Sequence, residues 1–185
     1  FDMYIVEKDT YVTEIPRTGS CTMVHYFEKM YTTRAQGHYT IGQALWDIKI
    51  IPAKTYAIIR DPVDRLVSCI NQNYRMFEGH AANKTDLIMA SLLNMVRGKS
   101  PPNTLFMRQK DYVDVEDVEL VPFDKYKNFM AGFGVTDPKN MFKDEKPVSL
   151  SDLQRYGSWT EIVGYYSKDV VLYKNSVNYG EMRCR

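Results

Sequence analysis

Short apolar segments with a strand pattern alternate along this chain with longer segments whose apolar residues recur at helical spacing. Residues 10–15 and 54–60 have the strand pattern, and the second of these is apolar enough to predict a buried strand. Residues 20–32 have the helical pattern. The expected core face of that helix comprises Met23, Val24, Phe27, Met30 and Tyr31.

A second helix is predicted to follow the second strand, from Pro62 to about residue 77. Asp61 is a favourable N-cap because its carboxylate can accept hydrogen bonds from the first amides, and proline suits the first helical position. The expected core stripe of this helix comprises Val63, Leu66, Val67, Ile70, Tyr74 and Phe77.

The alternation continues through the second half of the chain. The further elements expected are a helix over residues 85–96 that Gly98 ends, a strand over 118–122, a helix from Tyr126 to Gly134 and a helix over 159–175. Strand-helix units of this length favour a parallel sheet flanked by helices, so we expect an α/β fold. Because no linker or repeat divides residues 1–185, we expect a single domain.

Composition and charge narrow the classes of partner. The chain has 44% hydrophobic and 25% charged residues, as in ordinary globular proteins, and its net charge is only +1. This balance does not indicate a nucleic-acid partner or an anionic membrane, so any anion site must be local. No apolar run reaches the ~18 residues of a membrane span. The cysteines, Cys21, Cys69 and Cys184, are odd in number, and we expect free thiols in a reducing compartment.

The segment Pro-Arg-Thr-Gly-Ser-Cys-Thr, residues 16–22, leads from the first predicted strand into the first helix. A helix start presents unpaired amides and the positive end of the helix dipole, Gly19 allows close approach, and Arg17 adds a permanent charge. The hydroxyl groups available there belong to Ser20, Thr22 and Thr18. The pattern predicts a phosphate site, and the alternative is a plain turn in which Ser20 or Cys21 begins the helix. The Walker A pattern is absent, which disfavours an ATPase or kinase without excluding it.

A second motif, Arg-Asp-Pro-x-x-Arg-x-x-Ser, runs from Arg60 to Ser68. Arg60 closes the second strand beside a helix start, which predicts a second anion site. The alternative is that Arg60 pairs with Asp61 or Asp64 and that Ser68 lies on the helix surface. Ligands of parallel sheets bind beyond the carboxyl ends of the strands, where both motifs are expected to lie. Together they suit a ligand with phosphates at both ends.

These two motifs resemble the nucleotide-binding motifs of the sulfotransferases that use 3′-phosphoadenosine 5′-phosphosulfate (PAPS), in the form of the carbohydrate (Golgi-type) branch. The resemblance implies a P-loop NTPase-like sulfotransferase fold. It also implies transfer of a sulfuryl group from PAPS to a hydroxyl acceptor, a glycan or a small molecule, with 3′,5′-diphosphoadenosine (PAP) as product and no metal. The segments with a weaker likeness to the family are residues 105–113, 120–135 and 163–174.

The resemblance also implies roles for individual residues. The 5′ side of the nucleotide would be held by Arg17, Thr18, Gly19, Ser20, Cys21 and Thr22, and the 3′-phosphate by Arg60 and Ser68. The family usually has lysine at the position of Arg17, which here would supply the charge that balances the leaving phosphate. Cys21 replaces a usual small hydroxyl residue. Lys146 is a candidate for a later contact with the cofactor.

Deprotonation of a hydroxyl acceptor requires a base with a pKa near ~6.5, which favours histidine. His38, in Ala-Gln-Gly-His-Tyr, resembles the Gly-His segment of the family, whose histidine acts as base in several members, so His38 is the predicted catalytic base. A structural or substrate-contact role is the alternative. We expect His25 to be structural, beside the core stripe, and His80 to be exposed. Glu14, just before the phosphate loop, is the alternative base.

Two other functions remain open from the sequence. A nucleotide-dependent kinase would bind ATP with magnesium and ignore a 3′-phosphate, and a non-catalytic nucleotide-binding module would bind PAP without turnover. We expect a cytoplasmic protein of bacterial or viral type. A Golgi-lumen location is the alternative, if the chain is a trimmed catalytic domain.

Overall fold

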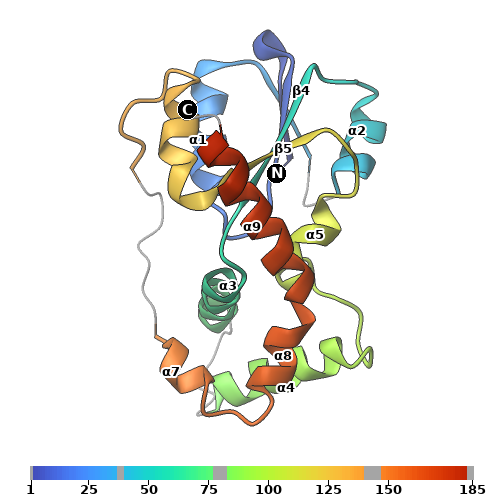
Figure 1. Ribbon diagram of the computed structural model, residues 1–185, viewed down its shortest axis with the longest axis vertical. Coiled ribbons are helices and arrows are strands. Elements are labelled where there is room, and N and C mark those ends of the chain that lie inside the picture. Colours follow the sequence, from blue (N-terminus) through green and yellow to red (C-terminus); the bar gives the residue numbers. More distant parts are fainter. Residues whose placement is uncertain (1, 37–39, 77–82, 140–146, 183–185) are drawn as a thin grey trace.

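The computed structural model describes residues 2–36, 40–76, 83–139 and 147–182, which form an α/β fold (Figure 1). Within these residues, five strands form one mixed sheet in the order β3-β1-β2-β4-β5. The strands are β1 (Asp2–Ile5), β2 (Thr10–Thr13), β3 (Thr33–Gln36), β4 (Lys54–Ile59) and β5 (Val118–Pro122).

The sheet is parallel only in part. β2, β4 and β5 pair in parallel, as the alternation of strands and helices predicts. β1 pairs antiparallel with both β2 and β3, so the expectation of a wholly parallel sheet is wrong on that side. The physical reason is the connection between β1 and β2, which consists of the 3-10 turn Val6–Lys8 and Asp9. A parallel crossover needs about a dozen residues or more, so this connection can only produce a hairpin.

Helices cover both faces of the sheet and extend below it in Figure 1. The helices are α1 (Ser20–Met30), α2 (Ile41–Ile48), α3 (Pro62–Met76), α4 (Lys84–Val96), α5 (Gln109–Tyr112), α6 (Tyr126–Ala131), α7 (Leu150–Leu153), α8 (Trp159–Tyr165) and α9 (Ser167–Met182). Further 3-10 turns lie at Thr104–Phe106 and Phe123–Lys125. α1 and α6 pack on one sheet face, and α2, α5 and α9 pack on the other. A separate core joins α3, α4, α7 and α8 below the sheet.

Most of the predicted elements form near their predicted positions, and several predictions need correction. Met30, expected on the core face of α1, is the last residue of that helix and is exposed. α6 ends at Ala131 rather than at Gly134, and Phe77 of the expected α3 stripe lies outside the described residues. The last predicted helix is two helices, α8 and α9, separated at Tyr166. The core stripe of α3 is rotated from the one expected, since Val63 and Val67 are only half-buried. The residues of α3 that are buried are Pro62, Arg65, Leu66, Ser68, Cys69, Ile70 and Asn71.

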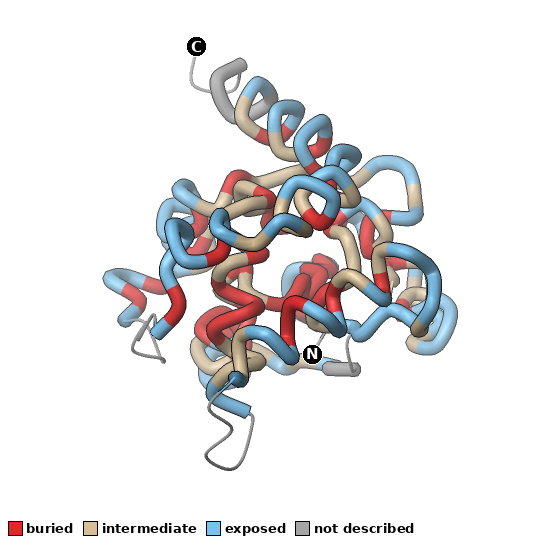
Figure 2. Tube along the Cα trace, turned by 90° about the horizontal axis from the view of Figure 1, so that it is seen from below, coloured by how far each residue is buried: buried red, intermediate tan, exposed pale blue. Residues whose placement is uncertain are grey.

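Buried residues lie between the sheet and its helices and also among α3, α4, α7 and α8, whereas the outer sides of the helices are exposed (Figure 2). In the part of the chain that the structure describes, no helix combines the length and apolar character needed to cross a bilayer. The ends of the parallel strands β2 and β4 lie close to the starts of α1 and α3, which places both sequence motifs in one region.

Candidate functional site

The loop between β2 and α1 is shaped by two residues with left-handed backbone. Arg17 has φ of 68° and Gly19 has φ of 85°. A Cβ atom on residue 19 would lie 3.2 Å from the Cε2 atom of Phe123, so glycine allows the loop to pack closely against that ring. The hydroxyl of Thr18 donates to the carbonyl of Ile15 at 2.7 Å and closes the turn. The loop therefore has one tightly defined path into α1.

α1 begins at Ser20, with Gly19 as its N-cap. The carbonyl of Gly19 accepts hydrogen bonds from the amides of Thr22 and Met23. The amides of Ser20 and Cys21 precede the first intrahelical donors and so have no acceptor within their own helix. These two amides, at the positive end of the α1 dipole, are the loop's means of holding an anion.

The hydroxyl groups predicted to assist the loop are less accessible than the sequence suggests. Thr18, Ser20 and Thr22 are all buried, whereas Cys21 is exposed. The Thr18 hydroxyl directs its proton inward to the Ile15 carbonyl. The backbone amides, together with the Arg17 side chain, are therefore the main donors that this loop offers.

The second motif begins where β4 ends. Asp61 caps α3, because its Oδ1 atom accepts hydrogen bonds from the amides of Val63 and Asp64, each at 3.0 Å. The N-cap predicted from the sequence is thereby confirmed. The guanidinium carbon of Arg60 lies 4.8 Å from the centroid of the Phe123 ring. The same ring packs against Gly19 in the loop between β2 and α1, which we call the glycine loop. Phe123 therefore touches both motifs.

The two motifs meet through direct hydrogen bonds. Arg17 Nε donates to Ser68 Oγ at 2.8 Å, and Arg60 Nη1 donates to the carbonyl of Arg17 at 3.2 Å. Ser68 is buried within α3 rather than on its surface. Ser68 accepts the bond from Arg17 with its hydroxyl oxygen, so a side chain of the first motif contacts a side chain of the second directly. Arg17, Arg60 and Ser68, predicted for the two sides of a nucleotide, are thus joined in one hydrogen-bonded cluster.

Arg65 is the residue of the second motif to which the sequence assigned no role. It is 1% exposed and donates hydrogen bonds to three backbone carbonyls. The acceptors are Pro16 at 2.9 Å, Met107 at 2.9 Å and Leu105 at 3.2 Å. Arg65 therefore joins α3 to the start of the glycine loop and to the segment before α5. Its helical phase, three residues after Pro62 and four before Cys69, could have indicated burial.

A buried polar chain fixes the backbone of Arg60. The side-chain amide of Gln109 accepts from the Arg60 amide at 2.9 Å and donates to the Arg60 carbonyl at 2.8 Å. The two carboxylate oxygens of Asp169, on α9, accept from the amides of Gln109 and Lys110. Burial raises the pKa of Asp169, while these amides and the charge of Arg65 act in the opposite direction. Asp169 of α9 therefore positions Gln109, and Gln109 in turn fixes the backbone of Arg60 at the end of β4.

Positive charge is concentrated in this region although the chain is nearly neutral. Burial raises the pKa of the Cys69 thiol, and the charges of Arg65, Arg17 and Arg60 all act to lower it. Three guanidinium groups therefore lie close enough to Cys69 to influence one thiol. These three cations could attract an anionic ligand.

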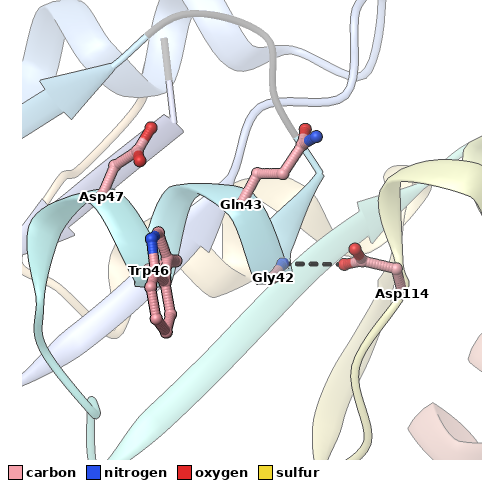
Figure 3. A pocket seen from close by; sticks show the side chains of 5 residues that line it. All are labelled: Gly42, Gln43, Trp46, Asp47 and Asp114. Atoms are coloured by element: carbon pink, nitrogen blue, oxygen red, sulfur yellow. Dashed lines mark hydrogen bonds between the residues drawn. The ribbon is translucent and has the colours of Figure 1, made fainter.

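Several predicted residues lie outside the described part of the chain, namely His38, His80, Lys146 and Cys184. The chain re-enters the described part at Thr40, whose hydroxyl caps α2 by accepting from the Gln43 amide. The Gly42 amide donates to Asp114 Oδ1 at 2.7 Å, which ties the start of α2 to the segment after α5 (Figure 3). The start of α2 is therefore anchored on the side of the sheet that carries α5 and α9.

The remaining candidate bases occupy different environments. Glu14 directly follows β2 and comes just before the loop of residues 16–22 in the sequence. Its side chain is buried, with 2% of the residue exposed. His25 is half-buried on α1, where its Nε2 atom lies 2.9 Å from Lys29 Nζ and its ring meets Tyr26 edge-on. The structural role expected of His25 stays a prediction. The thiols of Cys21 and Cys69 are both free.

Comparisons of the chain with protein-family models, with curated proteins and with solved structures gave no match. Within the described residues, no group of three or more histidine, cysteine, aspartate or glutamate side chains could hold a metal ion.

Proposed function

We propose that the chain is a sulfotransferase that uses PAPS, with the P-loop-like architecture of that family, and that it acts on a hydroxyl acceptor such as a carbohydrate. The observation that supports this most directly is the contact between the two motifs, in which Arg17 reaches Ser68 and Arg60 reaches the Arg17 carbonyl. One ligand with charged groups at two ends can then contact both motifs at once.

The donor groups present fit such a nucleotide. The amides of Ser20 and Cys21 at the start of α1 are suited to the 5′-phosphate, which is the usual mode of anion binding at a helix N-terminus. Arg60 and Ser68 supply a guanidinium and a hydroxyl, which are suited to the 3′-phosphate. Arg17, between the two, would balance the negative charge that develops on the 5′-phosphate.

The chemistry proposed is an in-line displacement at sulfur. The acceptor oxygen forms a bond to sulfur while the bond from sulfur to the 5′-phosphate oxygen breaks, and the acceptor proton passes to a base, for which His38 is the candidate. The protein contributes position and charge, as in phosphoryl transfer. The proposed roles are therefore separable, because the arginines act on the nucleotide and the base acts on the acceptor.

The decisive experiment compares nucleotide affinities by calorimetry. PAP is expected to bind more tightly than ADP or ATP, since only PAP can contact both motifs. In Arg60→Ala the binding of PAP is expected to weaken by about 1.5–3 kcal/mol, the scale of a hydrogen bond to a charged group. Arg155→Ala is the matched control, because the Arg155 side chain is 81% exposed.

Two results would contradict the proposal. Equal affinity for PAP and ADP would mean that the protein does not recognise the 3′-phosphate. Tight binding of ATP only with magnesium would favour a kinase. Where PAP binds as expected, incubation with labelled PAPS and a panel of glycans and small alcohols then separates an enzyme from a non-catalytic binding module.

A further inference from the structure

A groove of about 670 Å³ lies on the sheet face that α6 covers only in part. The groove is lined by the start of β4, by β5, by α6 and by the turn that follows α6. α6 ends at Ala131, and the chain then turns at Gly134, which has φ of 85°. The strand positions near Lys54 and Glu119 are therefore left without a covering helix.

The apolar surface of the groove is aromatic. The rings of Tyr56 and Phe129 lie 5.0 Å apart between centroids, and those of Phe129 and Phe133 lie 5.1 Å apart. All three rings are half-buried, so each packs against its neighbours and still lines the groove. The planes of these ring pairs are inclined by 63° and 55°, so the groove offers another aromatic ring both edge and face contacts.

The charged residues that line the groove are mostly cations. Lys8, Lys54 and Lys125 are exposed and come from three separate segments, whereas Glu119 is the one acidic residue among the described lining residues. Lys8 also lies 5.7 Å from the centroid of the Tyr31 ring, which holds its ammonium group near the groove. The potential at the groove is thus positive above an aromatic floor.

We propose that this groove binds a planar aromatic anion. The ring of the ligand would lie against Tyr56, Phe129 and Phe133, and its acidic group would face the lysines. This combination of aromatic floor and cationic rim is complementary to such a ligand in both apolar surface and charge. The groove shares none of its described lining residues with the candidate nucleotide site, so the inference does not depend on the function proposed above.

The test uses two fluorescent probes that differ in charge. These are 8-anilinonaphthalene-1-sulfonate and its uncharged analogue N-phenyl-1-naphthylamine, titrated into the full chain. The sulfonate is expected to bind saturably and more tightly than the neutral probe. The double variant Lys54→Glu/Lys125→Glu is expected to weaken binding of the sulfonate about tenfold, as the reversal of two rim charges should, and to leave the neutral probe within about twofold.

The experiment also includes a control variant and an NMR measurement of where the sulfonate binds. Lys99→Glu reverses an exposed charge at the end of α4 and should leave both affinities unchanged. In ¹H–¹⁵N spectra the sulfonate should shift the amides of Gly132 and Phe133. The proposal is overturned if the sulfonate binds the double variant as it binds the wild type, or if its saturable shifts lie elsewhere. Displacement by 1-naphthoate or naphthalene-1-sulfonate supports it, and displacement by neither contradicts it.

Discussion

Replacement of Arg65 by methionine tests whether this buried guanidinium organises the candidate site. The three carbonyls that it serves belong to Pro16, Leu105 and Met107, at 2.9, 3.2 and 2.9 Å. A hydrogen bond to a charged group contributes about 1.5–3 kcal/mol, so three such bonds add to roughly 4.5–9 kcal/mol before relaxation. Methionine also removes the cost of burying a charge, and the expected loss of unfolding free energy is therefore about 3–5 kcal/mol.

The assay is equilibrium unfolding in urea. A loss of this size is a large part of the ~5–15 kcal/mol that stabilises a typical domain, so the midpoint should fall strongly. Arg65→Lys keeps the charge but not the planar fork of donors, and an intermediate loss is expected. Arg155→Met is the control, because its side chain is 81% exposed and its effect should stay within about 0.5 kcal/mol. A loss below about 1 kcal/mol in Arg65→Met would refute the reasoning.

Three further predictions address the loop, the buried acid and the candidate base. Gly19→Ala forces a side chain into left-handed backbone and against Phe123, so the unfolding free energy should fall by about 1–2 kcal/mol, and unchanged urea stability would contradict the close packing. Because burial raises the pKa of Asp169 in the folded state, wild-type stability should decline as the pH rises from the ordinary value of about 3.9 through the folded pKa. Asp169→Asn should lack that decline in urea unfolding from pH 3 to 7, and an identical pH profile would exclude Asp169 as its source. His38→Ala should reduce turnover by about 10²–10⁴ with PAP affinity nearly unchanged, and full activity would exclude His38 as the base.

The sequence predicted the elements whose apolar pattern is strong. β4 and β5 form at the predicted residues, and α1 and α3 begin where Ser20 and Pro62 were expected to start them. The same pattern could not reveal β3, Thr33–Gln36, which is polar and is held at the sheet edge by backbone pairing with β1. Polar and charged residues on such a strand discourage pairing with another chain, and they leave no apolar pattern in the sequence.

The sequence could predict where the candidate site lies, but it could not predict the hydrogen bonds that hold the site together. Arg17 and Arg60 could be selected because charged residues stood at expected strand ends, and Ser68 was selected through the family resemblance. Gln109 and Asp169 lie far along the chain and act on backbone atoms, so no local pattern connects them with Arg60. Such residues are found only when the fold brings distant segments together.

The link from Asp169 to Gln109 to Arg60 has a practical consequence for shortened forms of this protein. A fragment that stopped before α9 would retain both motifs in full. It would nevertheless lack the Asp169 carboxylate, which accepts hydrogen bonds from the first amides of α5. Gln109 would then be less firmly placed to bond the backbone of Arg60 at the end of β4. Expression boundaries drawn around the motifs alone should therefore yield a fragment that cannot assemble the site, whatever its solubility.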